Sequence, residues 1–370
     1  METVEEFGAE ASAWLSANRA DAPPDYGAIV PAANVDAARA WQRRLADAGF
    51  AGIHWPASVG GRELTPAHTG AWIEACARAE VPPFLNMVGH VLAAGSVLAF
   101  GTEEQQAEHL PPTRTGERVW CQLFSEPGAG SDLASLSTRA EPDPATGGWR
   151  LTGQKVWCSN GRVADWGICL ARTGFDGRPH DGISFFLVDM AAPGIDVRPL
   201  RQLTGSSEFD EVYLDAAPVG PGQLVGPVDG GWGVAMATLT NERGHIGASA
   251  ISLQRRLDAL LALGRSRGLD PVRRDALVRL WCRGRVLLAL AGWQGPVASV
   301  AGSLLKLGVT ELLFDTAVLR ASLAGAEAML TGDVATGLLG APGGRIAGGT
   351  TQVQKNIIGE RLLGLPREPR

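Results

Sequence analysis

The spacing of apolar residues changes twice along the chain. Up to about residue 118, and again from Gly230 onward, apolar residues recur every three or four positions, which predicts amphipathic helices. Between about 119 and 224 the spacing falls to two, and short turns rich in glycine, proline and aspartate separate the segments. The sequence therefore predicts helices, then a β domain, then further helices. It lacks the strand–helix alternation of a Rossmann fold.

Individual elements follow from the same spacing. Thr102, followed by two acidic residues, is the expected cap of a helix in the first region. Other helices are expected over residues 35–48 and 69–79 in that region, and over 232–263, 272–293 and 303–330 in the last. Strands are expected over residues 149–152, 168–171, 183–188 and 208–214.

These elements predict an α+β multidomain fold. Its expected parts are an N-terminal helical domain over residues 1–118, a middle β-sandwich or barrel domain over 119–226, and a C-terminal four-helix bundle over 227–370. A length of 370 residues is sufficient for two or three domains.

Composition narrows the functional classes. The net charge of −6 argues against nucleic acid or an anionic membrane as the main partner. The acidic N-terminus lacks the pattern of a signal peptide, and no apolar run approaches the length of a membrane span. The five cysteines form no CxxC pair and are expected to be reduced thiols in a cytoplasmic protein. The six histidines are dispersed, which indicates no metal site.

A glycine-rich loop follows an apolar segment at residues 120–132. The segment begins as a strand-like run and turns into a loop of glycine, proline and small hydroxyl residues. Glycine lets the backbone approach a ligand closely, and unpaired N–H groups can point at an anion. The pattern favours a binding loop. The alternative is a strand followed by an ordinary turn.

Residues 153–161 carry a second candidate. Trp157 and Ser159 stand two apart, hence on the same face if the segment is extended. A flat indole beside a hydroxyl can cover a planar heterocycle and bind its edge. A hairpin with a core tryptophan explains this stretch equally well.

Two further candidates lie in the C-terminal region. On a helix, the neighbours of Glu242 are mostly small or apolar, and burial raises a carboxyl pKa, which suits a general base. The alternative is an exterior salt bridge. The Gly348-Gly349-Thr350-Thr351 turn resembles a helix start whose hydroxyls and amides can bind a ligand, or a structural cap.

With these stretches in their order, the chain resembles the acyl-CoA dehydrogenase family of flavoproteins over nearly its whole length. Residues 124–132, Phe-Ser-Glu-Pro-Gly-Ala-Gly-Ser-Asp, resemble the family's flavin loop. Residues 155–160 resemble the segment whose tryptophan and hydroxyl pack on the isoalloxazine, and residues 348–354 resemble the C-terminal signature. Three ordered motifs are more specific than any one of them.

The resemblance implies FAD, bound between the β domain and the C-terminal helices with help from a partner subunit. It implies an acyl-CoA substrate whose α proton goes to a carboxylate while the β hydrogen leaves as hydride to flavin N5. By analogy, the substrate is contacted by Ser131, Arg243 and Gly349. The cofactor is contacted by Gln122, Leu123, Phe124, Ser125, Gly130, Ser131, Trp157, Cys158, Ser159, Thr350, Thr351 and Gln352.

The position of the base departs from the usual family pattern. Many members carry it as a glutamate directly before the Gly-Thr of the signature, where this chain has Gly348 preceded by Ala347, and neither accepts a proton. A minority place the base on a C-terminal-domain helix before an arginine, which Glu242-Arg243 resembles. This sub-group resembles actinobacterial-type acyl-CoA and steroid-CoA dehydrogenases, and a glycine at 348 leaves room for a bulky or branched acyl group.

Two segments of the family pattern are altered. The Arg-x-x-Phe-Gly segment, which usually reaches the partner subunit's FAD, is replaced at residues 264–271, and the Gln-x-x-Gly-Gly-x-Gly segment is missing near 330–340. Some relatives with such losses work as two unlike subunits that share the flavin sites. We therefore expect a homodimer or homotetramer, or a heterotetramer with a paralogous subunit.

The expected function is FAD-dependent α,β-dehydrogenation of an acyl-CoA thioester to the 2,3-enoyl thioester, with Glu242 as base. Electron-transfer flavoprotein or another acceptor would take up the electrons. Two alternatives remain open. One is a flavin oxidase or dehydrogenase acting on a carrier-protein thioester or another activated carbon acid. The other is a non-catalytic subunit of a heteromeric dehydrogenase.

Overall fold

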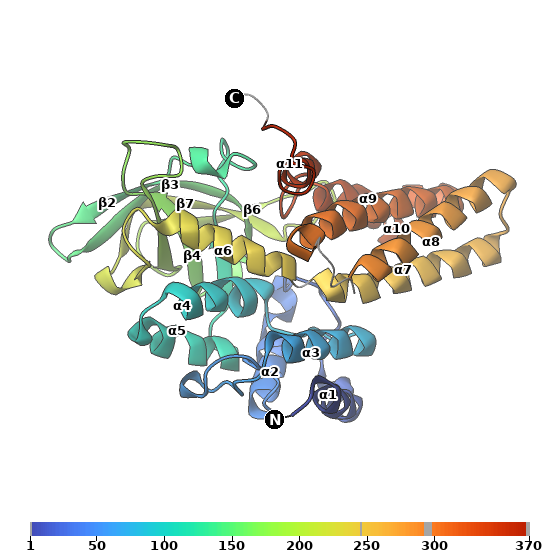
Figure 1. The fold of residues 1–370 in the computed structure, drawn as a ribbon, viewed down its shortest axis with the longest axis horizontal. Coiled ribbons are helices and arrows are strands. Elements are labelled where there is room, and N and C mark those ends of the chain that lie inside the picture. Colours follow the sequence, from blue (N-terminus) through green and yellow to red (C-terminus); the bar gives the residue numbers. More distant parts are fainter. Residues whose placement is uncertain (1, 245, 292–297, 368–370) are drawn as a thin grey trace. The chain divides into compact units, whose positions relative to one another are not determined.

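The computed structural model describes the chain except residues 1, 245, 292–297 and 368–370. The side chains of residues 240–252 and 298–300 are not described either. The chain divides into two compact units (Figure 1). Unit 1 comprises Met1–Gln202 and Ser206–Glu242, and unit 2 comprises Leu203–Gly205 and Arg243–Arg370.

Unit 1 begins with helices that pack around aromatic side chains. In α2, Ala38, Trp41 and Leu45 lie on one buried face, as their spacing of three and four predicts. Trp41 contacts Trp14 of α1, whose ring also contacts Phe50. The elements of this region are α1 (Val4–Asn18), η1 (Arg19–Asp21), η2 (Ala32–Asn34), α2 (Val35–Asp47), η3 (Ala57–Val59), α3 (Pro66–Ala79), the π-helix η4 (Val88–Ala93), α4 (Ala94–Phe100) and α5 (Glu103–Thr115).

The predicted cap at Thr102 is confirmed. The Thr102 hydroxyl accepts a hydrogen bond from the Gln105 N–H, at 3.3 Å, and the Gln105 side chain accepts one from the Thr102 N–H, at 3.0 Å. This reciprocal capping box satisfies two N–H groups that the first turn of α5 leaves without intrahelical partners.

The β region forms one eight-stranded sheet with the order β6-β7-β3-β2-β4-β5-β8, and β1 pairs with β4. Side chains from β5 and β7, which are distant in this order, share one core cluster, so the sheet curves around that core. The four predicted strands are confirmed as parts of β3, β4, β5 and β7, and the last was expected to begin one residue before β7 does. The strands are β1 (Trp120–Leu123), β2 (Arg139–Asp143), β3 (Gly148–Ser159), β4 (Trp166–Arg172), β5 (Ile183–Asp189), β6 (Ile195–Leu200), β7 (Phe209–Val219) and β8 (Leu224–Val225).

Helix α6 (Gly231–Gly244) packs on unit 1. Val234, Ala235 and Thr238 are buried on one face of it. The Thr238 hydroxyl lies 2.6 Å from the Ser96 hydroxyl of α4, and Figure 1 shows the two helices side by side. The short helices η5 (Leu133–Ser135), η6 (Gly161–Val163) and η7 (Pro221–Gln223) complete unit 1.

Unit 2 is helical, and leucine side chains of α7, α8 and α9 form its core. The helices predicted over residues 272–293 and 303–330 are confirmed as α8 and α9, although α9 ends earlier than expected because Gly325 takes a left-handed φ of 61°. The single helix predicted over 232–263 corresponds instead to two helices, α6 and α7, and residue 245 between them lies outside the described residues. Its elements are α7 (Ile246–Arg267), α8 (Pro271–Ala291), α9 (Ala298–Ala324), η8 (Gly325–Met329), α10 (Asp333–Gly344) and α11 (Thr351–Arg361). Among the helices that the structure describes, none is long and apolar enough to cross a membrane.

Candidate functional site

The glycine-rich loop leaves β1 and folds back on itself. Glu126 and Ala129 exchange two backbone hydrogen bonds, at 2.9 and 3.1 Å, which close a tight turn. The Ser125 carbonyl accepts a hydrogen bond from the Val156 N–H at 2.9 Å, which joins the loop to β3. The part of the loop after Ala129 is exposed.

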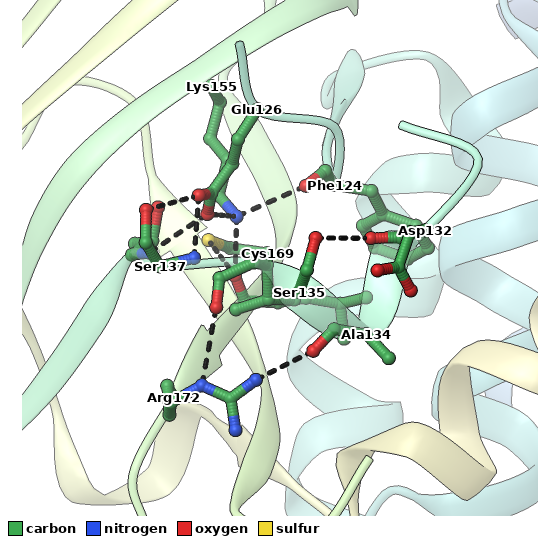
Figure 2. Close-up of polar contacts among 12 residues, drawn as sticks. Phe124, Glu126, Asp132, Ala134, Ser135, Ser137, Lys155, Cys169 and Arg172 are labelled. Atoms are coloured by element: carbon green, nitrogen blue, oxygen red, sulfur yellow. Dashed lines mark hydrogen bonds and ion pairs between the residues drawn. The ribbon is translucent and has the colours of Figure 1, made fainter. Parts of the chain in front are cut away.

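A buried ion pair lies beneath this loop (Figure 2). The Lys155 side chain is fully buried, and its ammonium donates to the Glu126 carboxylate at 2.8 Å and to the Phe124 and Leu170 carbonyls at 3.2 and 2.7 Å. All three ammonium protons therefore have acceptors. Lys155 comes from β3 and Glu126 from the loop, so the pair connects the two predicted cofactor segments of unit 1.

Glu126 is held as a carboxylate. Its oxygens also accept hydrogen bonds from the Ser137 N–H and hydroxyl, both at 2.7 Å, and from the Thr138 N–H at 2.9 Å. Burial alone would raise the pKa of Glu126. The charge of Lys155 and these hydrogen bonds outweigh burial and lower the pKa to about 2.

Several donors on the loop are unused. Within the part of the chain that the structure describes, the backbone N–H groups of Ser125, Gly130 and Ser131 have no acceptor. Gly130 and Ser131 are exposed, and Ser125 is half-buried. Unpaired N–H groups on a glycine-containing loop can bind phosphate oxygens or the polar edge of a heterocycle. The loop thus has the donors that the predicted binding function requires.

Trp157 is not a core residue. Its side chain is 56% exposed and contacts Phe209 edge-on, with ring centroids 5.8 Å apart. The alternative of a hairpin with a core tryptophan is therefore wrong. The strand is not simply extended either: Trp157 has a φ of 60°, and the register with β7 shifts between Lys155 and Cys158. A bulge of this kind redirects a side chain, and a left-handed non-glycine residue costs about 1–3 kcal/mol.

The other predicted cofactor residues of unit 1 could contact a ligand mainly through their backbone atoms. The side chains of Leu123 and Cys158 belong to the sheet core, Phe124 is buried, and burial raises the pKa of the Cys158 thiol. Their side chains cannot reach a ligand outside the core. Gln122 and Ser159 are half-buried.

In unit 2 the Gly348–Thr351 turn begins α11, and the interpretation as a structural cap holds for Thr350. Its hydroxyl accepts a hydrogen bond from the Val353 N–H at 3.2 Å. Gly348 and Gly349 take left-handed φ values of 64° and 91°, which favour glycine. The Gln352 side chain is exposed.

An ion pair that the sequence motifs did not indicate supports this turn. Arg345 donates to both oxygens of Glu311 at 2.8 Å, and the Thr351 hydroxyl donates to Glu311 at 3.3 Å. The motifs did not indicate the Lys155–Glu126 pair either, although Lys155 lies in the segment 155–160 and Glu126 in the loop 124–132. Sequence spacing carries no signal for either pair, because the partners are 34 and 29 residues apart.

The predicted base and its neighbour cannot be placed at the level of side chains. Glu242 and Arg243 belong to the last turn of α6, but their side chains lie outside the described residues, as does all of His245.

Comparison with known proteins shows which family the chain belongs to. Three family models match the chain: acyl-CoA dehydrogenase N-terminal domain over residues 17–117, middle domain over 121–217 and C-terminal domain over 229–363. The acyl-CoA dehydrogenase IpdE1 of Mycobacterium tuberculosis is 38% identical over 400 residues, covering 100% of this chain and 99% of the relative. The chain belongs to the acyl-CoA dehydrogenase family. It is therefore an oxidoreductase of a flavoprotein family, and the resemblance inferred from its motifs is confirmed.

A second relative supports this identification, and a solved structure shows the same fold. FadE34 of Mycobacterium tuberculosis, also named an acyl-CoA dehydrogenase, is 42% identical over 337 residues, covering 88% of this chain and 46% of that protein. The crystal structure of the ChsE4-ChsE5 complex from Mycobacterium tuberculosis matches with a TM-score of 0.81 at 24% identity, covering 100% of this chain and 99% of that one. The structural match confirms the predicted fold of an N-terminal helical part, a middle sheet and C-terminal helices.

Proposed function

We propose that this acyl-CoA dehydrogenase binds FAD and converts an acyl-CoA thioester to the 2,3-enoyl thioester, with Glu242 as the base. The observation that carries the proposal is the exposed, left-handed Trp157 beside a loop in which the N–H groups of Ser125, Gly130 and Ser131 have no acceptor among the described residues. An apolar ring held in solvent at a backbone cost is expected where a ligand covers it.

The residues of unit 1 fit the flavin. The indole of Trp157 offers a flat surface to the ring system, and the N–H groups of Ser125, Gly130 and Ser131 offer donors to its polar atoms. FAD, when bound, accepts the β hydrogen as hydride. The predicted contacts of Thr350, Thr351 and Gln352 with the cofactor, and of Ser131, Arg243 and Gly349 with the substrate, are part of this proposal.

The proton-accepting role falls to Glu242 because the usual position of the base is occupied by Gly348 and has no acceptor. Glu242 follows Thr238 by four residues in α6, and helical residues four apart share a face. On that face Val234 and Thr238 are buried. A carboxylate at this helix position has the chemistry to remove a weakly acidic α proton.

For the substrate and the assembly we propose a bulky or branched acyl group and a paralogous partner subunit. Gly348 leaves space that the usual glutamate would fill. One structural neighbour, ChsE4-ChsE5, is described as a complex of two differently named chains. Another, Tcur3481-Tcur3483, is described as a steroid acyl-CoA dehydrogenase. It matches with a TM-score of 0.82 at 24% identity, covering 100% of this chain and 99% of that one. The electron acceptor would be electron-transfer flavoprotein or a similar protein.

The deciding experiment is anaerobic bleaching of the flavin by a panel of short, long, branched and steroid acyl-CoAs and one acyl-carrier-protein thioester. Wild-type protein is expected to bleach with at least one of them. Glu242→Gln should bind FAD but barely bleach. The control, Asp258→Asn, changes an exposed acid of α7 and should bleach like wild type.

Full bleaching by Glu242→Gln would refute its role as base. Oxygen uptake without any other acceptor would indicate an oxidase instead. A colourless wild-type chain that binds FAD only with a paralogue would assign it to a subunit that cannot hold the cofactor alone.

A further inference from the structure

The Lys155–Glu126 ion pair joins the two flavin segments of unit 1 at one point. Glu126 directly follows Ser125 in the loop, and Lys155 stands two residues before Trp157 in β3. The side chains of the pair are 0% and 4% exposed. Figure 2 shows Lys155 reaching across from its strand to the loop, with Phe124 and Glu126 around its ammonium.

Other connections between the loop and β3 are few. Among the described residues, one backbone hydrogen bond joins them, from the Val156 N–H to the Ser125 carbonyl. The tip of the loop, from Gly128 to Asp132, contains two glycines that restrict the backbone little. The separation of the loop from β3 therefore depends mainly on the hydrogen bonds from Lys155 to Phe124 and Glu126.

A buried ion pair specifies geometry more than it stabilises. Both charges lose their hydration, and only an arrangement that satisfies every donor and acceptor compensates for this. Lys155 reaches that state only when Phe124, Glu126 and Leu170 all lie within hydrogen-bond distance. Two apolar residues would fill the same space but would tolerate many loop positions.

We propose that Lys155 and Glu126 are positioning residues that hold the flavin loop and the Trp157 segment at a fixed separation before the cofactor binds. The donors of Ser125 and the indole of Trp157 are then preformed, and FAD binding loses no free energy to ordering of the loop. This inference rests on the proposed function, because FAD is the ligand it concerns.

Two variants test the pair. Glu126→Gln keeps the shape but replaces one accepting oxygen with a donating NH₂ group, so either Lys155 or Ser137 loses its acceptor. The double variant Glu126→Gln/Lys155→Met removes both charges at similar volume and remains foldable if the single variant is not. The control is Asp143→Asn, which breaks another pair of a buried carboxylate in the same sheet, with Arg150 at 2.9 Å.

Two readouts are needed, both on the full chain and both restricted to the folded fraction measured by urea unfolding. The first is hydrogen exchange of the flavin-free protein over residues 122–138 and 153–160. The second is FAD binding, followed by flavin fluorescence and by the fine structure of the flavin absorption band. A role confined to stability would change the urea midpoint and leave both readouts as in wild type.

We expect faster exchange in both segments and a rise in the FAD dissociation constant of about tenfold or more, equivalent to ~1.4 kcal/mol, in both pair variants but not in Asp143→Asn. Unchanged exchange, or faster exchange with unchanged FAD affinity and spectrum, would overturn the inference. If wild type fails to bind FAD, the proposed function fails, while the exchange data still decide whether the pair orders the loop.

Discussion

Replacing Trp157 tests the site most directly, because the structure predicts an unusual order of stability. Alanine and glycine variants both remove the indole, but only glycine relieves the left-handed backbone, whose φ is 60°. Truncating a fully buried aromatic residue costs about 3–5 kcal/mol. Because Trp157 is 56% exposed, we expect less than half of that loss, about 1.5–2 kcal/mol, for Trp157→Ala.

The difference in stability between the alanine and glycine variants tests the backbone conformation of Trp157 directly. At an ordinary strand position glycine is less stable than alanine by about 0.5–1 kcal/mol. A left-handed conformation costs a non-glycine residue about 1–2 kcal/mol. The second effect is larger, so Trp157→Gly should be the more stable of the two, by about 0.5–1 kcal/mol.

Urea unfolding of the flavin-free chain at unchanged m-value measures this difference, and flavin fluorescence measures FAD affinity. Both variants should bind FAD more weakly than wild type. The control is Phe100→Ala, which truncates a half-exposed aromatic residue at the end of α4 and should bind FAD normally. An alanine variant more stable than the glycine variant would contradict the backbone argument. Wild-type FAD affinity in both variants would contradict the role of the indole.

Three other predictions concern stability. Burial lowers the pKa of His90 to about 4, below the unfolded value near 6.5. The contribution of this histidine to the free energy of unfolding is therefore complete above pH ~6.5, and it falls by up to ~1.4 kcal/mol per pH unit as the pH is lowered towards 4. His90→Phe, whose ring fits the stacking on Phe84, should flatten this fall in urea titrations across that range. Thr102→Ala should lower the unfolding free energy by about 1 kcal/mol, and Thr102→Ser should largely retain it. Glu311→Gln breaks a half-exposed pair with Arg345, so it should lower stability by at most ~1 kcal/mol yet speed hydrogen exchange over residues 348–353.

Local signals in the sequence predicted the elements well. The capping box at Thr102 and the cap at Thr350 each involve residues within one helical turn, so their letters alone specify the contacts. The change of apolar period from about four to two located the sheet between its helical neighbours. These features depend on neighbours in the chain, which a sequence displays directly.

The site depended on contacts that a sequence does not display. A lysine within a strand indicates a solvent-facing position, yet Lys155 is fully buried because an acid 29 residues away and two carbonyls surround it. The bulge at Trp157 breaks the two-residue alternation, so no periodicity argument could predict its exposure. The π-helix over Val88–Ala93 likewise has no distinct spacing.

The division of the chain gives the proposed position of the base a physical meaning. The family's usual base belongs to the C-terminal signature, which here lies in unit 2 with Gly348. Helix α6 instead belongs to unit 1 up to Glu242, and Thr238 anchors it to α4 through Ser96. The flavin loop and Trp157 are in the same unit. The proposed base on α6 would therefore belong to the same compact unit as residues 124–132 and Trp157, and packing within that one unit would fix its helix relative to them.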